Sequence, residues 1–126
     1  MAKHVLIVDD EAAFRFSAGI ALRQAGYITS EAGDGREALS LLCLRQGSVS
    51  PVDAILLDIQ MPKMSGLELI DEVKSHGIDI PPVIVISGYA DEPMVSDLGK
   101  RGYNALLHKP FEPEEMIKMV EMMVGR

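Results

Sequence analysis

One stretch near the middle of the chain, residues 54–66, constrains the fold more than any other. It opens with a continuous apolar run over 54–57, reaches Asp58, and is then interrupted by Pro62 and Gly66. Because the run does not alternate apolar and polar residues, it is typical of a strand buried on both faces, as in a parallel α/β sheet. Open sheets of this kind bind their ligands at the carboxyl ends of the strands. We therefore expect the chemistry of the protein at Asp58.

A helix is expected to follow this strand directly. Ser65 and Glu68 have the Ser-x-x-Glu spacing of a capping box, in which each side chain bonds the backbone amide of the other residue. The helix is predicted over 66–76, and Gly77 ends it. The local order is thus strand, acidic tip, loop and helix.

Four more strand–helix units make up the rest of the chain. Strands are predicted over 5–8, 27–32, 83–86 and 104–108, and helices over 11–25, 35–46, 92–101 and 113–124. Five such units require right-handed crossovers and a parallel sheet with helices on both faces. The strands around Ile28 and Leu106 are the least apolar, which places them at the edges. The prediction is a doubly wound, flavodoxin-like α/β fold with five helices and strand order 2-1-3-4-5.

Length and charge limit the classes of function. A chain of 126 residues suits one domain, which we place over 1–126. Twelve Lys and Arg against nineteen Asp and Glu give a formal net charge of −7, so direct binding to nucleic acid is not expected. No apolar run approaches the ~20 residues that span a bilayer. The N-terminus also lacks a signal-peptide pattern. We therefore expect a cytoplasmic protein without a membrane partner.

The few cysteine and histidine residues suggest no site of their own. The single Cys43 excludes an internal disulfide, suits a reducing compartment, and is expected to be a semi-buried structural thiol because it lies among leucines. His4, His76 and His108 lack the spacing of a metal site and are expected to be structural or surface residues.

In the last helix, Met116, Met119, Val120 and Met123 are predicted to face the core. Ile117, Met122 and Val124 lie off that stripe and leave apolar surface for a partner.

Polar side chains stand at the ends of four predicted strands. Asp9 and Asp10 follow the first strand, Asp58 the third, Ser87 the fourth and Lys109 the fifth. In the strand order 2-1-3-4-5 the three carboxylates meet in one crevice, where they repel one another unless a cation is held there. Oxygen ligands without His or Cys favour Mg²⁺.

These groups also suit a phosphoryl group on the central carboxylate. Lys109 supplies a mobile positive charge, and Ser87 supplies a hydroxyl donor. A carboxylate such as Asp58 accepts a phosphoryl group as an acyl phosphate. Phosphoryl transfer requires this positioning and neutralisation of charge more than covalent assistance from the protein.

Along essentially its whole length the chain resembles the receiver domain of two-component response regulators. The resemblance is carried by residues 9–11, 58–66, 86–88 and 109–111, which read Asp-Asp-Glu, Asp-Ile-Gln-Met-Pro-Lys-Met-Ser-Gly, Ile-Ser-Gly and Lys-Pro-Phe. It implies that Asp58 accepts a phosphoryl group from a phosphohistidine on a sensor histidine kinase or a histidine phosphotransfer protein. It implies a signalling module, not an enzyme.

The resemblance also assigns ligands. Asp10, Asp58 and the backbone carbonyl of Gln60, with Asp9 through water, would hold Mg²⁺. Ser87 and Lys109 would bind the phosphoryl oxygens. The peptide bond before Pro110 is implied to be cis.

The resemblance further implies a switch that controls a downstream effector protein or output domain. The switching face consists of the fourth helix, the fifth strand and the fifth helix, and we also consider a homodimer through it. The usual aromatic switch residue, three positions before the lysine, is Leu106 here. Leucine offers less area and no polar tip, so we expect weaker switching or a role for Tyr89 in the loop after Ser87.

Other functions remain as alternatives. Taken singly, the acidic pair is a solvated helix cap, Ser87 a turn hydroxyl and Lys109 a surface lysine; only the set indicates a site. A non-phosphorylated interaction module of the same fold is the main alternative, although no acid, hydroxyl or lysine is missing. A haloacid dehalogenase-type hydrolase needs a second Asp two positions after the nucleophile, where Gln60 stands. A flavin carrier needs a Gly/Ser/Thr-rich first loop, and this one is acidic.

Overall fold

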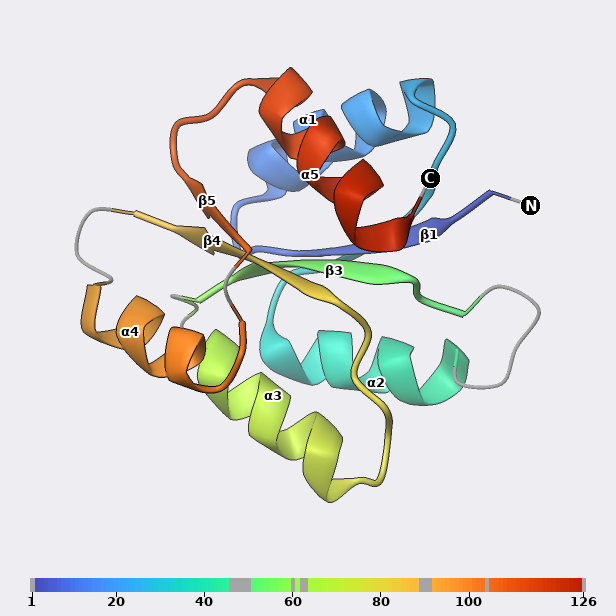
Figure 1. Ribbon diagram of the computed structural model, residues 1–126. Helices are drawn as coiled ribbons and strands as arrows, with labels where there is room; N and C mark the ends of the chain where they lie inside the picture. Colours follow the sequence, from blue (N-terminus) through green and yellow to red (C-terminus); the bar gives the residue numbers. More distant parts are fainter. Residues whose placement is uncertain are drawn as a thin grey trace.

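A parallel five-stranded sheet forms the centre of the molecule (Figure 1). The computed structural model describes residues 2–45, 51–59, 61, 64–88, 92–103 and 105–125. Its elements, in chain order, are β1 (His4–Val8), α1 (Ala12–Gln24), β2 (Ile28–Ala32), α2 (Gly35–Arg45), β3 (Ala54–Asp58), α3 (Gly66–Ser75), β4 (Val83–Ser87), α4 (Glu92–Lys100), β5 (Leu106–His108) and α5 (Pro113–Val124). The strand order is β2-β1-β3-β4-β5, which confirms the predicted topology.

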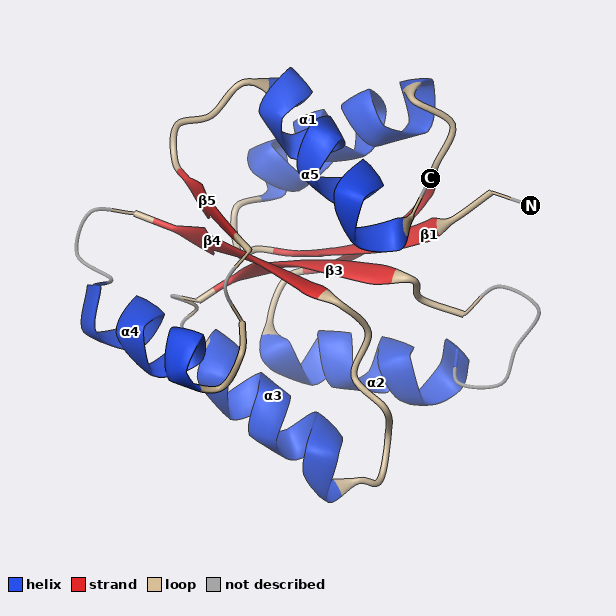
Figure 2. Cartoon of the chain, in the orientation of Figure 1, coloured by secondary structure: helices blue, strands red, loops and turns tan. Residues whose placement is uncertain are grey.

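The helices cover both faces of the sheet. α1 and α5 lie on one face, and α2, α3 and α4 lie on the other (Figure 2). Each face has its own core, because alternate residues of a strand point to opposite sides. Val5 and Ile7 of β1 pack with α1 and α5, whereas Leu6 and Val8 pack with α2 and α3.

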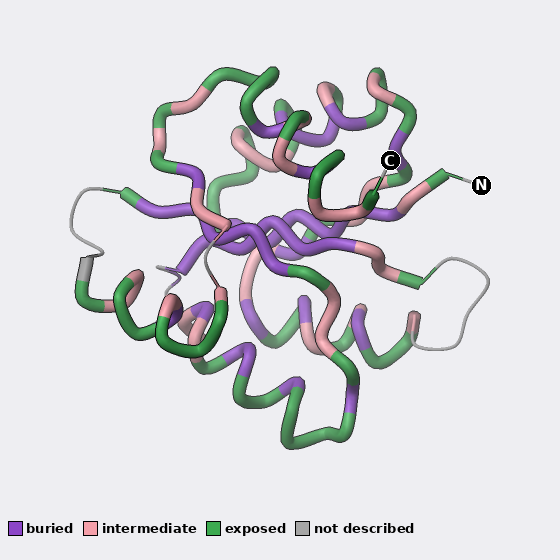
Figure 3. Tube along the Cα trace, viewed as in Figure 1, coloured by how far each residue is buried: buried purple, intermediate pink, exposed green. Residues whose placement is uncertain are grey.

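Burial separates central strands from edge strands. Every residue of β1, β3 and β4 is buried, as the purple core of Figure 3 shows. β2 and β5 pair on one side only and are partly exposed, which confirms their assignment to the edges. The three central strands therefore end together at one rim, where the polar side chains follow them.

Element boundaries agree with the sequence to within one or two residues. α1 begins at Ala12 and not at 11, and β5 begins at Leu106 and not at 104. Ala105 precedes the strand, and Asn104 lies outside the described residues. Gly26 and Gly77 end their helices with φ of 98° and 72°, the left-handed region that glycine enters without strain.

Cys43 corrects one prediction. It is exposed, not semi-buried. In α2 the residues four apart, Ala38 and Leu42, face the core, and one residue further the helix has turned by about 100° towards solvent. Leu44 beside it is 77% exposed.

The apolar stripe of α5 is largely as predicted. Met116 and Val120 are buried, with Met119 and Met123 packed against the same core. The three residues expected off this stripe behave differently: Ile117 and Val124 also contact the core, whereas Met122 is 79% exposed. Within the described ranges, no helix has the length and apolarity needed to cross a membrane.

The start of α3 has the predicted capping box. The Ser65 hydroxyl accepts from the amide of Glu68 at 3.2 Å, and the Glu68 carboxylate accepts from the amide of Ser65 at 3.4 Å. This cap fixes the end of the loop that follows Asp58.

Ser65→Ala is expected to lower the free energy of unfolding by about 1 kcal/mol, because an amide of the first turn loses its acceptor. Urea unfolding at pH 7 measures it. Ser40→Ala, at an exposed interior position of α2, is the control and should be neutral or slightly stabilising. Equal effects of the two substitutions would contradict a capping role.

Candidate metal centre and functional site

Three carboxylates converge at the carboxyl ends of β1 and β3. Asp9 follows β1 and is fully buried, Asp58 ends β3 with 8% exposure, and Asp10 is exposed. One oxygen of each lies within 4.8 Å of one oxygen of the other two. The convergence follows from register, since Val8 of β1 pairs with Leu57 of β3.

This cluster fits a hard divalent cation. Two unit charges 4.8 Å apart repel by about 3.5 kcal/mol at an effective dielectric constant of about 20. Three carboxylates so placed are stabilised by a positive charge among them, and an all-oxygen donor set is the one that Mg²⁺ prefers. Gln60, the fourth predicted ligand, lies outside the described residues.

Asp9 is held at both carboxylate oxygens. The Glu11 amide donates to its Oδ1 at 2.9 Å, and the Lys109 ammonium donates to its Oδ2 at 2.7 Å. Arg15 donates to the Asp9 carbonyl at 2.6 Å and pairs with Glu31 at 3.2 Å. The orientation of the buried carboxylate is therefore fixed by the residue that precedes α1 and by Lys109 just after β5.

Lys109 brings a positive charge to the cluster. Its Nζ lies 2.7 Å from Asp9, 3.1 Å from Glu11 and 4.5 Å from the ring centroid of Phe14. Burial by itself lowers the pKa of Lys109. The hydrogen bonds to Asp9 and Glu11 and the charges of Asp9 and Asp58 outweigh burial, so the net shift raises the pKa. The residue stays cationic at neutral pH.

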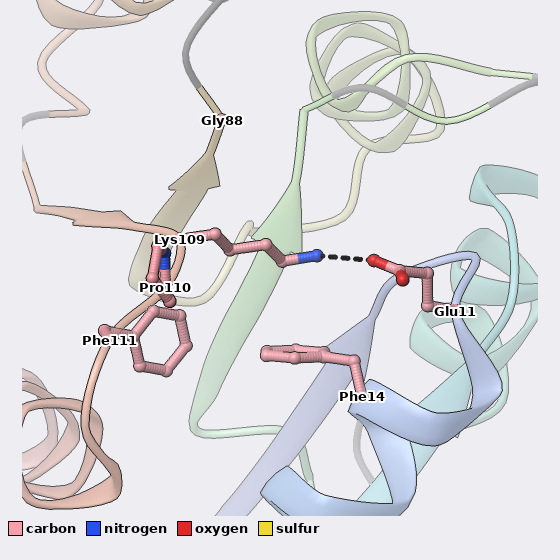
Figure 4. A pocket seen from close by; sticks show the side chains of 6 residues that line it. All are labelled: Glu11, Phe14, Gly88, Lys109, Pro110 and Phe111. Carbon is pink, nitrogen blue, oxygen red and sulfur yellow. Dashed lines mark hydrogen bonds and ion pairs between the residues drawn. The ribbon is translucent and has the colours of Figure 1, made fainter.

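A pocket of about 500 Å³ opens beside this ammonium group. Figure 4 shows the Lys109 side chain extending across it towards Glu11, with the rings of Phe14 and Phe111 below. The two rings meet edge to face, with centroids 5.8 Å apart and an interplanar angle of 84°. The pocket thus joins an apolar wall to a charged rim. The peptide bond between Lys109 and Pro110 is cis, as the resemblance implies.

Ser87 ends β4 and is 1% exposed. Its carbonyl accepts from the Lys109 amide at 2.9 Å, and its hydroxyl forms a hydrogen bond of 3.2 Å with Nδ1 of His108. The adjoining residue, Ile86, pairs with Asp58. The structure therefore places Ser87 on the strand next to the acidic cluster, with its backbone joined to that of Lys109.

Sequence reasoning did not assign three of the contacts. Glu11 follows the acidic pair in the sequence and also binds Lys109. The ring of Phe14 lies under the same ammonium group, a contact that no sequence motif indicates. His108 was read as a structural or surface residue, yet it is bonded to Ser87. The only sequence feature that connects His108 with the site is its position next to Lys109.

The chain resembles known proteins over nearly its full length. A family model described as "Response regulator receiver domain" matches residues 5–121. The chain is 34% identical over 125 residues to the transcriptional regulatory protein PdtaR of Mycobacterium tuberculosis, an alignment covering 98% of this chain and 58% of that protein. It is 35% identical over 126 residues to the response regulator MprA of Mycolicibacterium vanbaalenii, covering 100% of this chain and 52% of that protein. The chain thus spans little more than half the length of these relatives.

Solved structures agree with this result. The chemotaxis protein CheY4 of Vibrio cholerae has a TM-score of 0.79 and 31% identity, covering 98% of this chain and 99% of that one. The Francisella response regulator 1452 receiver domain has a TM-score of 0.81 and 28% identity, covering 98% of both chains. Together, the family model over 5–121, the relatives above 30% identity and the shared fold show that this chain belongs to the receiver domains of two-component response regulators.

Proposed function

We propose that Asp58 accepts a phosphoryl group from a phosphohistidine of a sensor histidine kinase or a histidine phosphotransfer protein, in a Mg²⁺-dependent reaction that controls a downstream effector protein or output domain. The observation that carries the proposal is the convergence of three carboxylates with the Lys109 ammonium, which donates to Asp9 at 2.7 Å. Neither an exposed surface lysine nor an acidic helix cap requires three carboxylates and an ammonium group in one cluster.

Each side chain has a distinct role in the transfer. A carboxylate oxygen of Asp58 attacks phosphorus as the bond from phosphorus to the donor imidazole breaks, which leaves an acyl phosphate on Asp58. Lys109 exchanges its carboxylate partners for a phosphoryl oxygen, and the Ser87 hydroxyl donates to another. Asp9, which keeps the Glu11 amide as a donor, need not be left unpaired by this exchange.

The acidic residues also have a role as ligands. Asp10, Asp58 and the carbonyl of Gln60, with Asp9 through water, would hold Mg²⁺, which neutralises charge on the carboxylates and on the transferring group. Since the fully buried Asp9 is already bound at both oxygens, Asp10 and Asp58 are the acids better placed for direct ligation.

The partners of the domain follow from its charge and its relatives. A net charge of −7 favours a protein partner over direct contact with nucleic acid. The relative from M. tuberculosis is named a transcriptional regulatory protein. Because this domain is acidic, we assign any contact with nucleic acid to another domain or chain. We place the proposed phosphoryl transfer in the cytoplasm, since the lone Cys43 suits a reducing compartment.

A second candidate function is an interaction module that is never phosphorylated. It would be favoured by loss of an acid, the hydroxyl or the lysine, and all are present. A small phosphodonor separates the two functions without knowledge of the cognate kinase.

Incubation with acetyl phosphate and Mg²⁺ is expected to add the mass of one phosphoryl group, measured on the intact protein. The same incubation with EDTA in place of Mg²⁺ should add none, because the carboxylates then repel the incoming group. An unchanged mass in both samples would favour the interaction module and contradict the proposed function.

A further inference from the structure

The Ser87 hydroxyl is joined to the outer edge of the sheet through His108. Ser87 of β4 and His108 of β5 are paired in register, so their side chains lie on the same face of the sheet. Ser87 Oγ and His108 Nδ1 are 3.2 Å apart. One partner is 1% exposed and the other is exposed, so this hydrogen bond connects the interior to the surface.

His108 also lines a second groove. This groove, of about 440 Å³, lies between β5 and α5 and is bordered by Leu106, Glu115, Lys118, Met119 and Met122 with His108 itself. Its two charged residues have opposite signs, and Met122 is 79% exposed. A single imidazole therefore touches both the buried hydroxyl and the groove.

Leu106 cannot provide this connection. It lies on the same face of β5 two residues earlier, but an aliphatic side chain forms no hydrogen bond to Ser87. Tyr89, considered above for this role, lies outside the described residues. Among the described residues, His108 is the side chain for which the structure records a hydrogen bond to the Ser87 hydroxyl.

We propose that His108 is a positioning residue for Ser87 and transmits the state of the Asp58 site to the groove beside α5. This inference rests on the proposed function. As part of this proposal, the Ser87 hydroxyl donates its one proton to Nδ1 of His108 before phosphorylation and to a phosphoryl oxygen afterwards. When a phosphoryl group on Asp58 takes that proton, His108 must either donate from Nδ1 to Ser87 or turn towards the groove. Either change alters the imidazole and its neighbours Met119 and Met122.

The imidazole itself gives the first measurement. Nitrogen-15 NMR of the ring is recorded before and after addition of Mg²⁺ with beryllium trifluoride, a mimic of the phosphoryl group on a carboxylate. The His108 Nδ1 signal is expected to shift in the wild type, and the shift should be severalfold smaller in Ser87→Ala. His76, which bonds the Glu72 carbonyl in α3, serves as the internal reference and should not move.

Two substitutions test the transmission to the groove. His108→Asn keeps a polar atom close to the position of Nδ1, whereas His108→Leu has similar bulk and no polar atom. The methyl signals of Met119 and Met122 are expected to respond to beryllium trifluoride in the wild type and in His108→Asn, and severalfold less in His108→Leu. His76→Leu is the matched control and should respond as the wild type does. Intact mass after acetyl phosphate is measured on each variant.

The outcomes separate this inference from the proposed function. If His108→Leu gains phosphoryl mass and the two methionines respond in full, His108 does not transmit the signal. If the His108 ring is unmoved in a wild type that gains phosphoryl mass, the inference is also wrong while the proposed function stands. If the wild type gains no mass, both fail together.

Discussion

Asp58→Asn is expected to remove phosphoryl acceptance completely while leaving the fold at least as stable as the wild type. The amide has the shape of the carboxylate but cannot form the acyl phosphate. Replacing one of three mutually repelling charges also relieves the cluster, so unfolding without Mg²⁺ should occur at an equal or higher temperature. Intact mass after acetyl phosphate and thermal unfolding with and without Mg²⁺ measure both effects.

Mg²⁺ separates this variant further from the wild type. Because Asp58 is a proposed ligand, the stabilisation by Mg²⁺ should be much smaller in Asp58→Asn than in the wild type. Asp79→Asn, at an exposed aspartate between α3 and β4, is the control and should keep both the mass gain and the response to Mg²⁺. Phosphoryl mass retained in Asp58→Asn would assign the acceptor to another residue.

The central sheet and the acidic cluster were predictable because both depend on local pattern. Continuous apolar runs identify doubly buried strands, and in a parallel sheet the residues after those runs share one edge whatever the details of the helices. Asp9 and Asp58 are brought together by that rule alone. The exposure of Cys43 was not predictable from its apolar neighbours, since a rotation of one residue along α2 decides it.

Contacts between side chains of distant segments needed the structure. The bond between Ser87 and His108 depends on the register of β4 with β5, and β5 is only three residues long. The contact of Lys109 with Glu11 depends on how the segment after β5 approaches the start of α1. Neither leaves a periodic signal in the sequence.

The proposed function gives Lys109 two roles that conflict, and this makes its removal informative. Before phosphorylation the ammonium neutralises the fully buried Asp9. In the transfer proposed above, it would leave Asp9 for a phosphoryl oxygen. A bound Mg²⁺ would supply positive charge to the same carboxylates, so it would compensate in part for loss of the lysine. A variant without the ammonium should therefore lose stability and transfer rate but gain dependence on Mg²⁺.

Lys109→Met is expected to slow phosphorylation by acetyl phosphate about 100-fold or more, the usual effect of removing one group that stabilises a transferring anion. Without Mg²⁺ the free energy of unfolding should fall by about 2 kcal/mol, since Asp9 loses a charged partner. Adding Mg²⁺ should then raise the free energy of unfolding of the variant by more than it raises that of the wild type. Lys118→Met, at an exposed lysine of α5, should leave rate and stability near those of the wild type.

The pH dependence of this stability difference tests the ion pair itself. The folded-state pKa of Lys109 is raised above its ordinary value of 10.5, so its contribution is fully present below that value and is lost as pH rises through the folded-state pKa. Urea unfolding of wild type and Lys109→Met without Mg²⁺ should thus give a constant difference from neutral pH to about pH 10, and a shrinking one above it. A difference that persists unchanged at higher pH would mean that packing of the lysine stem on Phe14, and not the charge beside Asp9, stabilises the wild type.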